Sequence, residues 1–380
     1  MALEDTALSR EISQLCDVRV VHSGGATDLY ITCAGPEGAA VDEARRGYEQ
    51  IAALLKSHHA WIFQERLFTA PGLIEHVLAA RSAAYGVIDD GVRPTILAVE
   101  APITPFVGIQ VHAVAGVGRP RTMELTEAAV GRCFEHGGCQ WLSASGLAGA
   151  KTAAATVQAR QAFEKADALL GAAGTDFSSV ARTWIWMDDI VAWYDEFNPV
   201  RTQFFRERGL IGREGLLPAS TGIGVSPAGG RRCAIDLFAV WGKPEAIVRH
   251  HAAGKQRSAY EYGSAFARAA TALTPAGKLV FCSGTAAIDH TGATCHVGDA
   301  RRQTSMTIDN VVSVLSELDC GGRDVVQAIA YCKTPEVYAE FVSRWQGELN
   351  WPCLVMPGDI CRDNLLFELE AAAAPRARRI

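Results

Sequence analysis

A single acidic residue interrupts an apolar segment near the C-terminus. Glu368 lies in the segment 365–369, Leu-Leu-Phe-Glu-Leu, whose bulky apolar residues predict a β-strand. A carboxylate in such a strand lies at a rim, pairs with a cation or serves chemistry, because burying it alone is costly. An apolar environment raises the pKa of a carboxyl group, and an acid that keeps its proton near neutral pH suits general acid catalysis. We therefore take Glu368 as a candidate acid–base residue.

Arginines are the candidates for holding an anionic substrate. Tyr194 and Arg201 are seven residues apart in a predicted helix, 190–208, so they project from one face of it after two turns. Taken singly, such arginines are more often surface ion pairs. In a chain of net charge −6, however, a small anion must be held by local guanidinium groups, which bind carboxylates with paired hydrogen bonds.

Composition and charge exclude several classes of function. The 380 residues are 49% hydrophobic and 21% charged, which is typical of a globular chain with two or three domains. With 36 basic and 42 acidic residues, we expect no general field for nucleic acid or an anionic membrane. The N-terminus does not resemble a signal peptide, and no stretch approaches the length of an apolar membrane span. We expect a cytoplasmic protein with no membrane partner.

The eleven cysteines are scattered and odd in number, so they predict reduced, mostly buried thiols rather than a disulfide framework. Cys133, His136 and Cys139 form a partial metal-binding pattern that lacks a fourth ligand at usable spacing, so we expect no metal. The basic cluster at 376–379 is interpreted as a frayed tail.

The hydrophobic pattern repeats three times in the order β, α, β, α, β, β. The first unit has predicted strands at 29–35, 61–68, 94–99 and 108–114 and helices at 41–59 and 73–84. The second has strands at 141–146, 180–186, 218–224 and 233–240 and helices at 156–171 and 190–208. The third has strands at 278–284, 325–331, 352–356 and 365–371 and helices at 300–317 and 335–349. A period of roughly 125 to 130 residues indicates triplicated domains rather than short stacked repeats.

We predict units at 17–115, 117–243 and 247–375. The last strands of the first two units, 108–111 and 234–237, are weaker copies of the strand that carries Glu368. We interpret Gln110 and Asp236 as the counterparts of Glu368, so only the third unit keeps the glutamate.

The units resemble the RidA/YjgF family of small α+β domains. The likeness is carried by strands ending in Ser-Gly at 145–146 and 283–284, by a Pro-Ala strand at 218–221 and by Glu-Leu-Glu-Ala at 368–371. That family forms trimers with a site at each subunit interface, so three linked copies imply a monomer built as an intramolecular pseudo-trimer. Deaminases of the family carry an arginine just after Pro-Ala; here those positions are occupied by Ile96, Ser220 and Leu354.

A more specialised group, the chorismatases, which cleave pyruvate from chorismate, is also similar to this chain. The likeness rests on the stretches 181–184, 194–201, 217–224, 266–269 with 283–286, and the strand around Glu368. It implies that Arg201 and Arg268 bind the two carboxylates of chorismate. It further implies hydrogen bonds from Tyr194 and from Tyr260 or Tyr262, and places the catalytic glutamate at Glu368.

Within that resemblance, Gly284 in the strand motif and Cys361 seven residues before Glu368 go with formation of 3-hydroxybenzoate. Cys361 would then assist aromatisation, and no cofactor would be needed. Two alternatives stay open. One is a RidA-like enamine or imine deaminase, or other small-metabolite hydrolase, that uses Glu368 with a relocated arginine. The other is a non-catalytic metabolite-binding protein. The role of the first unit is also open.

Overall fold

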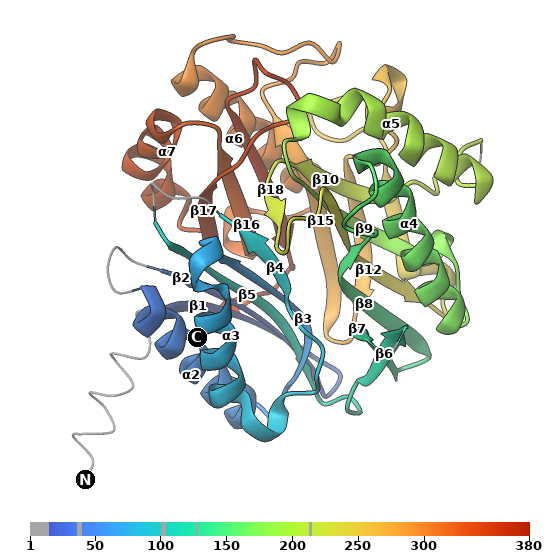
Figure 1. Ribbon diagram of the computed structural model, residues 1–380, viewed down its shortest axis with the longest axis vertical. Coiled ribbons are helices and arrows are strands. Elements are labelled where there is room, and N and C mark those ends of the chain that lie inside the picture. Colours follow the sequence, from blue (N-terminus) through green and yellow to red (C-terminus); the bar gives the residue numbers. More distant parts are fainter. Residues whose placement is uncertain (1–14, 36–39, 100–103, 127, 213–214) are drawn as a thin grey trace.

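Each third of the chain forms one β-sheet covered on its outer face by helices. The computed structural model describes residues 15–35, 40–99, 104–126, 128–212 and 215–380. The three sheets meet around a common interior, and the helices lie on the outside (Figure 1). The α+β fold of three units closed into an intramolecular pseudo-trimer, predicted from the repeat, is confirmed. Within the described part of the chain, no helix is long and apolar enough to cross a membrane.

The first sheet recruits strands from elsewhere in the chain. Its order is β11-β4-β3-β5-β2-β1-β19. Its strands are β1 (Cys16–Ser23), β2 (Ala26–Ala34), β3 (Trp61–Thr69), β4 (Thr95–Ala98), β5 (Phe106–Ala115), β11 (Ser226–Pro227) and β19 (Arg378–Arg379). Its helices are α2 (Ala40–Ser57) and α3 (Ile74–Tyr85). The prediction that the C-terminal basic cluster is a frayed tail is therefore wrong. Strand β19 pairs with the edge strand β1, and Arg379 forms an ion pair with Asp17 at 3.1 Å.

The second and third sheets follow one plan. The second has the order β10-β9-β12-β8-β7-β6 and the third β13-β14-β15-β18-β16-β17. The second contains β6 (Arg121–Leu125), β7 (Ala128–His136), β8 (Cys139–Ala148), β9 (Val180–Met187), β10 (Ala219–Ile223) and β12 (Cys233–Trp241), with α4 (Ala155–Ala172) and α5 (Ile190–Glu207). The third contains β13 (Ile247–His250), β14 (Ala269–Thr274), β15 (Gly277–Ala286), β16 (Val325–Cys332), β17 (Cys353–Pro357) and β18 (Phe367–Ala373), with α6 (Ala300–Glu317), α7 (Pro335–Phe341) and α8 (Gly347–Leu349).

Aromatic side chains join the three sheets in the interior. The ring of Phe238 contacts Phe63 of the first unit at a centroid distance of 5.6 Å and Phe281 of the third at 5.2 Å. All three belong to one buried cluster with residues from every sheet, whereas each remaining cluster fills the space between one sheet and its helices. Because burial of each such ring is worth about 1.5–3 kcal/mol, this shared core holds the units together.

Two of the cysteines form a disulfide, contrary to the prediction of reduced thiols throughout. Cys16 of β1 and Cys33 of β2 are joined, and the other cysteines are free. The two residues face each other directly in the antiparallel register of β1 and β2, at a Cα–Cα distance of 4.0 Å. A separation of 17 residues in sequence does not reveal that register.

Candidate active site

The candidate site lies where the second and third units meet along strand β10. The backbone N–H of Ala267 donates to the carbonyl of Pro218 at 2.9 Å, and that of Ser220 donates to Ser283 Oγ at 2.9 Å. Ser283 Oγ donates in turn to the carbonyl of Ala267 at 2.7 Å. The first two bonds cross the unit boundary and the third links their ends within the third unit, so together they fix β10 of the second unit against β15 and the segment before β14.

Glu368 is buried in this wall without a charged partner. It lies opposite Ala286 in the pairing of β18 with β15, and its side chain forms no hydrogen bond or ion pair with any residue that the structure describes. Burial, and then the negative charge of Glu370, raise the pKa of Glu368 from 4.5 to about 8, against the opposing influence of Arg182 and Arg268. Glu368 therefore holds its proton at neutral pH and can donate it.

Gly284 provides the space that the Glu368 carboxyl group occupies. The register of β15 against β18 shifts between Cys282 and Thr285, which forms a bulge at Gly284. A Cβ atom at position 284 would collide with the Glu368 carboxylate and would lie 2.9 Å from Thr221 Cγ2. A side chain at 284 would thus displace the candidate acid.

Two buried guanidinium groups face the cavity and lack carboxylate partners among the described residues. Arg201 and Arg268 are only 1% and 3% exposed. Arg201 donates to Asn198 Oδ1 at 2.6 Å, and its Nε has no partner. Arg268 donates to the carbonyl of Arg257 at 3.0 Å and to the hydroxyl of Tyr262. A buried charge without a counter-ion is costly, so the pair is arranged to receive an anion.

The ring of Phe266 lies near both of these cations. The guanidinium carbons of Arg201 and Arg268 lie 5.7 and 5.4 Å from its centroid. One aromatic ring therefore contacts both candidate anion-binding groups of the cavity.

The structure distinguishes the two tyrosines that the sequence left open. Tyr262 lines the cavity, and burial raises the pKa of its hydroxyl group even though Arg268 opposes this. Tyr260 lies outside this cavity, is 41% exposed and lines a different hollow. Tyr194 also lines the cavity, and burial, followed by the influence of Cys361, raises the pKa of its hydroxyl group. Both cavity tyrosines therefore remain hydrogen-bond donors at neutral pH.

Cys361 lies in the cavity wall as a neutral thiol. Burial, and then the neighbouring Glu368, raise the pKa of the Cys361 thiol to about 12. Arg362, which sequence reasoning missed, also lines the cavity and donates to the carbonyl of Gly292 at 2.9 Å. No motif singled out Arg362; its signal was its place directly after Cys361.

The cavity brings together every predicted site residue except Tyr260. It has a volume of about 140 Å³, and it is lined from the second unit by α5 and β10 and from the third by β15, β18 and the loops before them. The predicted residues on its wall are Tyr194, Arg201, Tyr262, Arg268, Gly284, Cys361 and Glu368. An enclosed space with one protonated carboxyl group, one thiol and several guanidinium groups can bind a small dianion and protonate it.

The register of the sheets corrects the predicted counterparts of Glu368. Glu368 pairs with Tyr331 across β18 and β16, and Glu370 pairs with Ile329. In the second unit, Ala234 and Asp236 occupy these two positions opposite Trp186 and Trp184. In the first unit they are occupied by Gly108 and Gln110, opposite Phe68 and Arg66. Asp236 and Gln110 therefore correspond to Glu370, and the counterparts of Glu368 are Ala234 and Gly108.

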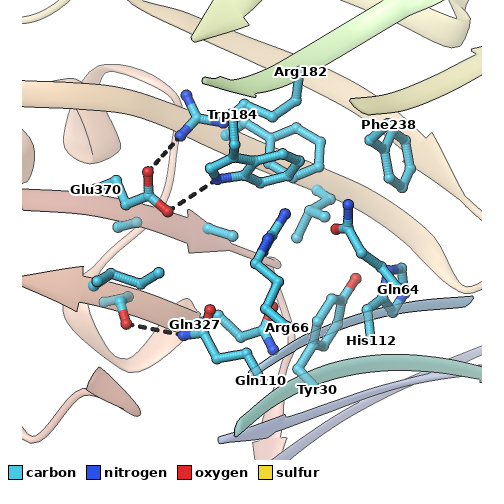
Figure 2. Close-up of a pocket in the computed structure, with 16 residues that line it drawn as sticks. Tyr30, Gln64, Arg66, Gln110, His112, Arg182, Trp184, Phe238, Gln327 and Glu370 are labelled. Atoms are coloured by element: carbon cyan, nitrogen blue, oxygen red, sulfur yellow. Dashed lines mark hydrogen bonds and ion pairs between the residues drawn. The ribbon is translucent and has the colours of Figure 1, made fainter. Parts of the chain in front are cut away.

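Glu370 and Asp236 belong to a polar network in the interior that sequence reasoning missed; Figure 2 shows the part of it around Glu370. Glu370 accepts hydrogen bonds from Arg182 Nη2 and Trp184 Nε1, both at 2.9 Å. Asp236 accepts from Arg66 Nε at 3.0 Å across the boundary between the first two units. Because the residues of each pair are 170 or more positions apart, no local pattern announced them.

The other two unit junctions have no carboxyl group at the position of Glu368. Between the first and second units, a cavity of about 640 Å³ contains Gly146 and Ala234. Between the third and first, Leu354 fills the space beside Gly108: a Cβ atom at 108 would lie 2.6 Å from Leu354 Cδ2. Acid–base chemistry at this strand position is therefore restricted to the junction of the second and third units.

Comparison with known proteins agrees with this architecture. Residues 263–373 match the model of the family described as Endoribonuclease L-PSP. A solved structure described as a chorismatase is 21% identical, covers 75% of this chain and 88% of its own, and has a TM-score of 0.59. The YjgF gene product of E. coli is 19% identical over 29% of this chain and 88% of its own, with a TM-score of 0.24. No curated protein sequence matches the chain significantly. The resemblance read from the sequence is thus confirmed at the level of structure: the chain has the fold of a chorismatase, and its C-terminal third matches the Endoribonuclease L-PSP family.

Proposed function

We propose that the protein is a chorismatase that converts chorismate into 3-hydroxybenzoate and pyruvate. The observation that carries this proposal is the meeting of one protonated carboxyl group, Glu368, with two buried and unpaired guanidinium groups, Arg201 and Arg268, in one cavity. Chorismate is a compact dianion, and its enol ether breaks when a proton reaches the methylene carbon. The choice of chorismate as the substrate comes from the resemblance in sequence and the likeness in fold. The cavity contains groups that are suited to bind and protonate it.

In the proposed reaction, Arg201 and Arg268 bind the two carboxylates while Tyr194 and Tyr262 donate hydrogen bonds. Glu368 gives its proton to the methylene carbon of the enolpyruvyl group. The neighbouring ring hydroxyl then attacks the ring carbon that carries the ether, and that carbon–oxygen bond breaks to release pyruvate. The hydroxyl proton returns to the Glu368 carboxylate, which leaves an arene oxide. All atoms of chorismate are retained in pyruvate and this intermediate.

Cys361 and Gly284 would direct the second half of the reaction. As a neutral thiol, Cys361 can donate a proton to the oxide oxygen as the epoxide opens. Loss of a ring proton then gives 3-hydroxybenzoate, an isomer of the arene oxide, so no oxidant or added water is needed. Because Gly284 has no side chain, the Glu368 carboxyl group can keep its position beside the substrate.

Incubation with chorismate tests the proposal. We expect pyruvate and 3-hydroxybenzoate in equal amounts, identified by chromatography against 3-hydroxybenzoate, 4-hydroxybenzoate and dihydroxycyclohexadiene carboxylate standards. Glu368→Gln, which keeps the shape of the side chain but removes the proton, should abolish turnover while chorismate still binds. Absence of pyruvate release from the unmodified protein would refute the proposal, and binding without turnover would indicate a metabolite-binding protein instead.

A further inference from the structure

Glu370 lies close to the candidate acid on the same face of one strand. Glu368 and Glu370 are two positions apart on β18, so their side chains point to the same side of the sheet. Both are buried, with exposures of 5% and 6%. Two carboxylates cannot both be charged at low cost in such a place, because their repulsion is poorly screened.

The surroundings of the two carboxyl groups decide which one is charged. Glu370 accepts hydrogen bonds from the cation Arg182 and from Trp184, whereas Glu368 has no donor among the described residues. Hydrogen bonds to a carboxylate favour its charged form. The negative charge is therefore placed on Glu370, and the proton on Glu368.

Arg182 and Trp184 are themselves held firmly (Figure 2). The guanidinium carbons of Arg182 and Arg66 lie 4.8 and 3.7 Å from the Trp184 ring centroid. Arg182 Nη2 also donates to Thr221 Oγ1, which accepts a second hydrogen bond from the backbone N–H of Gly284 at 2.9 Å. The interior network is thus bonded to the cavity wall on which Glu368 lies.

We propose that Glu370 is a positioning residue that keeps the Glu368 carboxyl group protonated and ready to act. The inference rests on the proposed role of Glu368 as the acid. Other titratable or charged groups also face Glu368 or its cavity from the elements packed against it: from α5 Tyr194, Asp195 and Arg201, from the segment before β14 Tyr262 and Arg268, from the loop before β18 Cys361 and Arg362, and from β16 Tyr331. Burial is the largest cause of the raised pKa of Glu368; among the charged groups that shift this pKa, Glu370 is the only carboxylate, so it is the one whose charge favours retention of the proton.

The test compares variants that keep or remove the charge at position 370. In Glu370→Gln we expect the pH above which kcat falls to move down by about one unit or more, because the carboxylate that opposes ionisation is gone. Glu370→Asp keeps the charge and should leave that pH near its original value. KM for chorismate should change little in either variant, since Glu370 does not line the cavity.

Asp236→Asn is the matched control. Asp236 occupies the corresponding position in the second unit and is equally buried in the same network, but it is not among the groups that shift the pKa of Glu368. Its removal should lower the melting temperature in the manner of Glu370→Gln without moving the pH profile. If both variants move the profile equally, or neither does, the inference fails.

Infrared titration separates this inference from the proposed function. The carbonyl stretch of a protonated carboxyl group should be present at pH 7 and disappear in Glu368→Gln, whether or not chorismate is turned over. Persistence of that band in Glu368→Gln would place the proton on Glu370 and overturn the inference, and this measurement does not require Glu370→Gln to fold. If the band behaves as expected but no pyruvate is released, the proposed function fails and the assignment of the proton stands.

Discussion

Glu368 couples the stability of the protein to pH because its pKa rises from 4.5 to about 8 on burial. Between these values the folded chain binds a proton that the unfolded chain has released. Since the folded state then holds more protons, the free energy of unfolding decreases as pH rises through this window. Below pH 4.5 the Glu368 carboxyl group is protonated in both the folded and the unfolded state, so it does not lower the free energy of unfolding.

We therefore expect Glu368→Gln to be more stable than the unmodified protein at pH 8, by on the order of 3–4 kcal/mol. At pH 4 the difference should vanish. Denaturation with urea at both pH values measures this, and equal differences at the two pH values would contradict the raised pKa. Because Glu368 is the proposed acid, we expect kcat to be steady below pH 8 and to fall above it.

Cys361 is expected to affect the product more than the first step. Cys361→Ala removes the thiol but not the acid, so pyruvate release should persist while the rate of 3-hydroxybenzoate formation falls by on the order of 10²-fold, the lower end of general acid contributions. Cys233→Ala is a suitable control, because Cys233 is a fully buried thiol of the second unit that does not line the cavity. An unchanged rate of 3-hydroxybenzoate formation in Cys361→Ala would remove this residue from the mechanism.

At the scale of elements, the bulge of β15 sets the position of the acid. Its register shift places Gly284, rather than a larger residue, against the end of the Glu368 side chain. Helix α5 also positions two site residues. Tyr194 and Arg201 are seven residues apart, so both lie on its cavity face, as predicted from helical geometry.

Gly284→Ala should reduce turnover by tenfold or more, about 1.4 kcal/mol in transition-state stabilisation, because its methyl group displaces the Glu368 carboxyl group. The displaced part is the end of a side chain, so the melting temperature should fall only slightly. Gly47→Ala in α2, where the added Cβ meets nothing closer than 3.6 Å, should leave turnover unchanged. Full activity of Gly284→Ala would show that this glycine does not position the acid.

At the scale of the whole molecule, buried ion pairs join one unit to the next. Arg66 of β3 binds Asp236 of β12, and both side chains are almost wholly buried. Arg182 of β9 binds Glu370 of β18 in the same manner. These pairs connect the first unit to the second and the second to the third, so loss of either cation leaves a buried carboxylate at a unit boundary.

Arg66→Met should destabilise the fold by about 3–5 kcal/mol, because it leaves the carboxylate of Asp236 buried without its cation. Arg45→Met, which breaks an exposed pair with Glu49 on α2, should leave the stability almost unchanged. Equilibrium unfolding in denaturant compares the two. A similar small loss in both would mean that the neutral groups that also donate to Asp236, the Thr95 hydroxyl, the Gly146 N–H and the Trp186 indole, stabilise its carboxylate without the cation.

Local patterns in the sequence determined most of the elements. The helix predicted at 190–208 is α5 (Ile190–Glu207), and the strand predicted at 325–331 is β16 (Val325–Cys332), because hydrophobic periodicity is read within one element. Strands β1, β6, β7 and β13 were missed because charged residues interrupt their apolar alternation. Strand β14 was missed because it consists of Ala, Thr and one Leu, and β11 and β19 because each has only two residues.

The sequence by itself also determined the threefold repeat and the residue types of the candidate site, because repeats and short motifs are local in the chain. The tertiary structure alone decided which residues correspond and which meet. The register of β5, β12 and β18 moved Gln110 and Asp236 from the position of Glu368 to that of Glu370. Chain folding placed Tyr262 in the cavity and Tyr260 outside it. Hydrogen bonds between residues 170 or more positions apart depend on how sheets pack, and nothing within a single element encodes that.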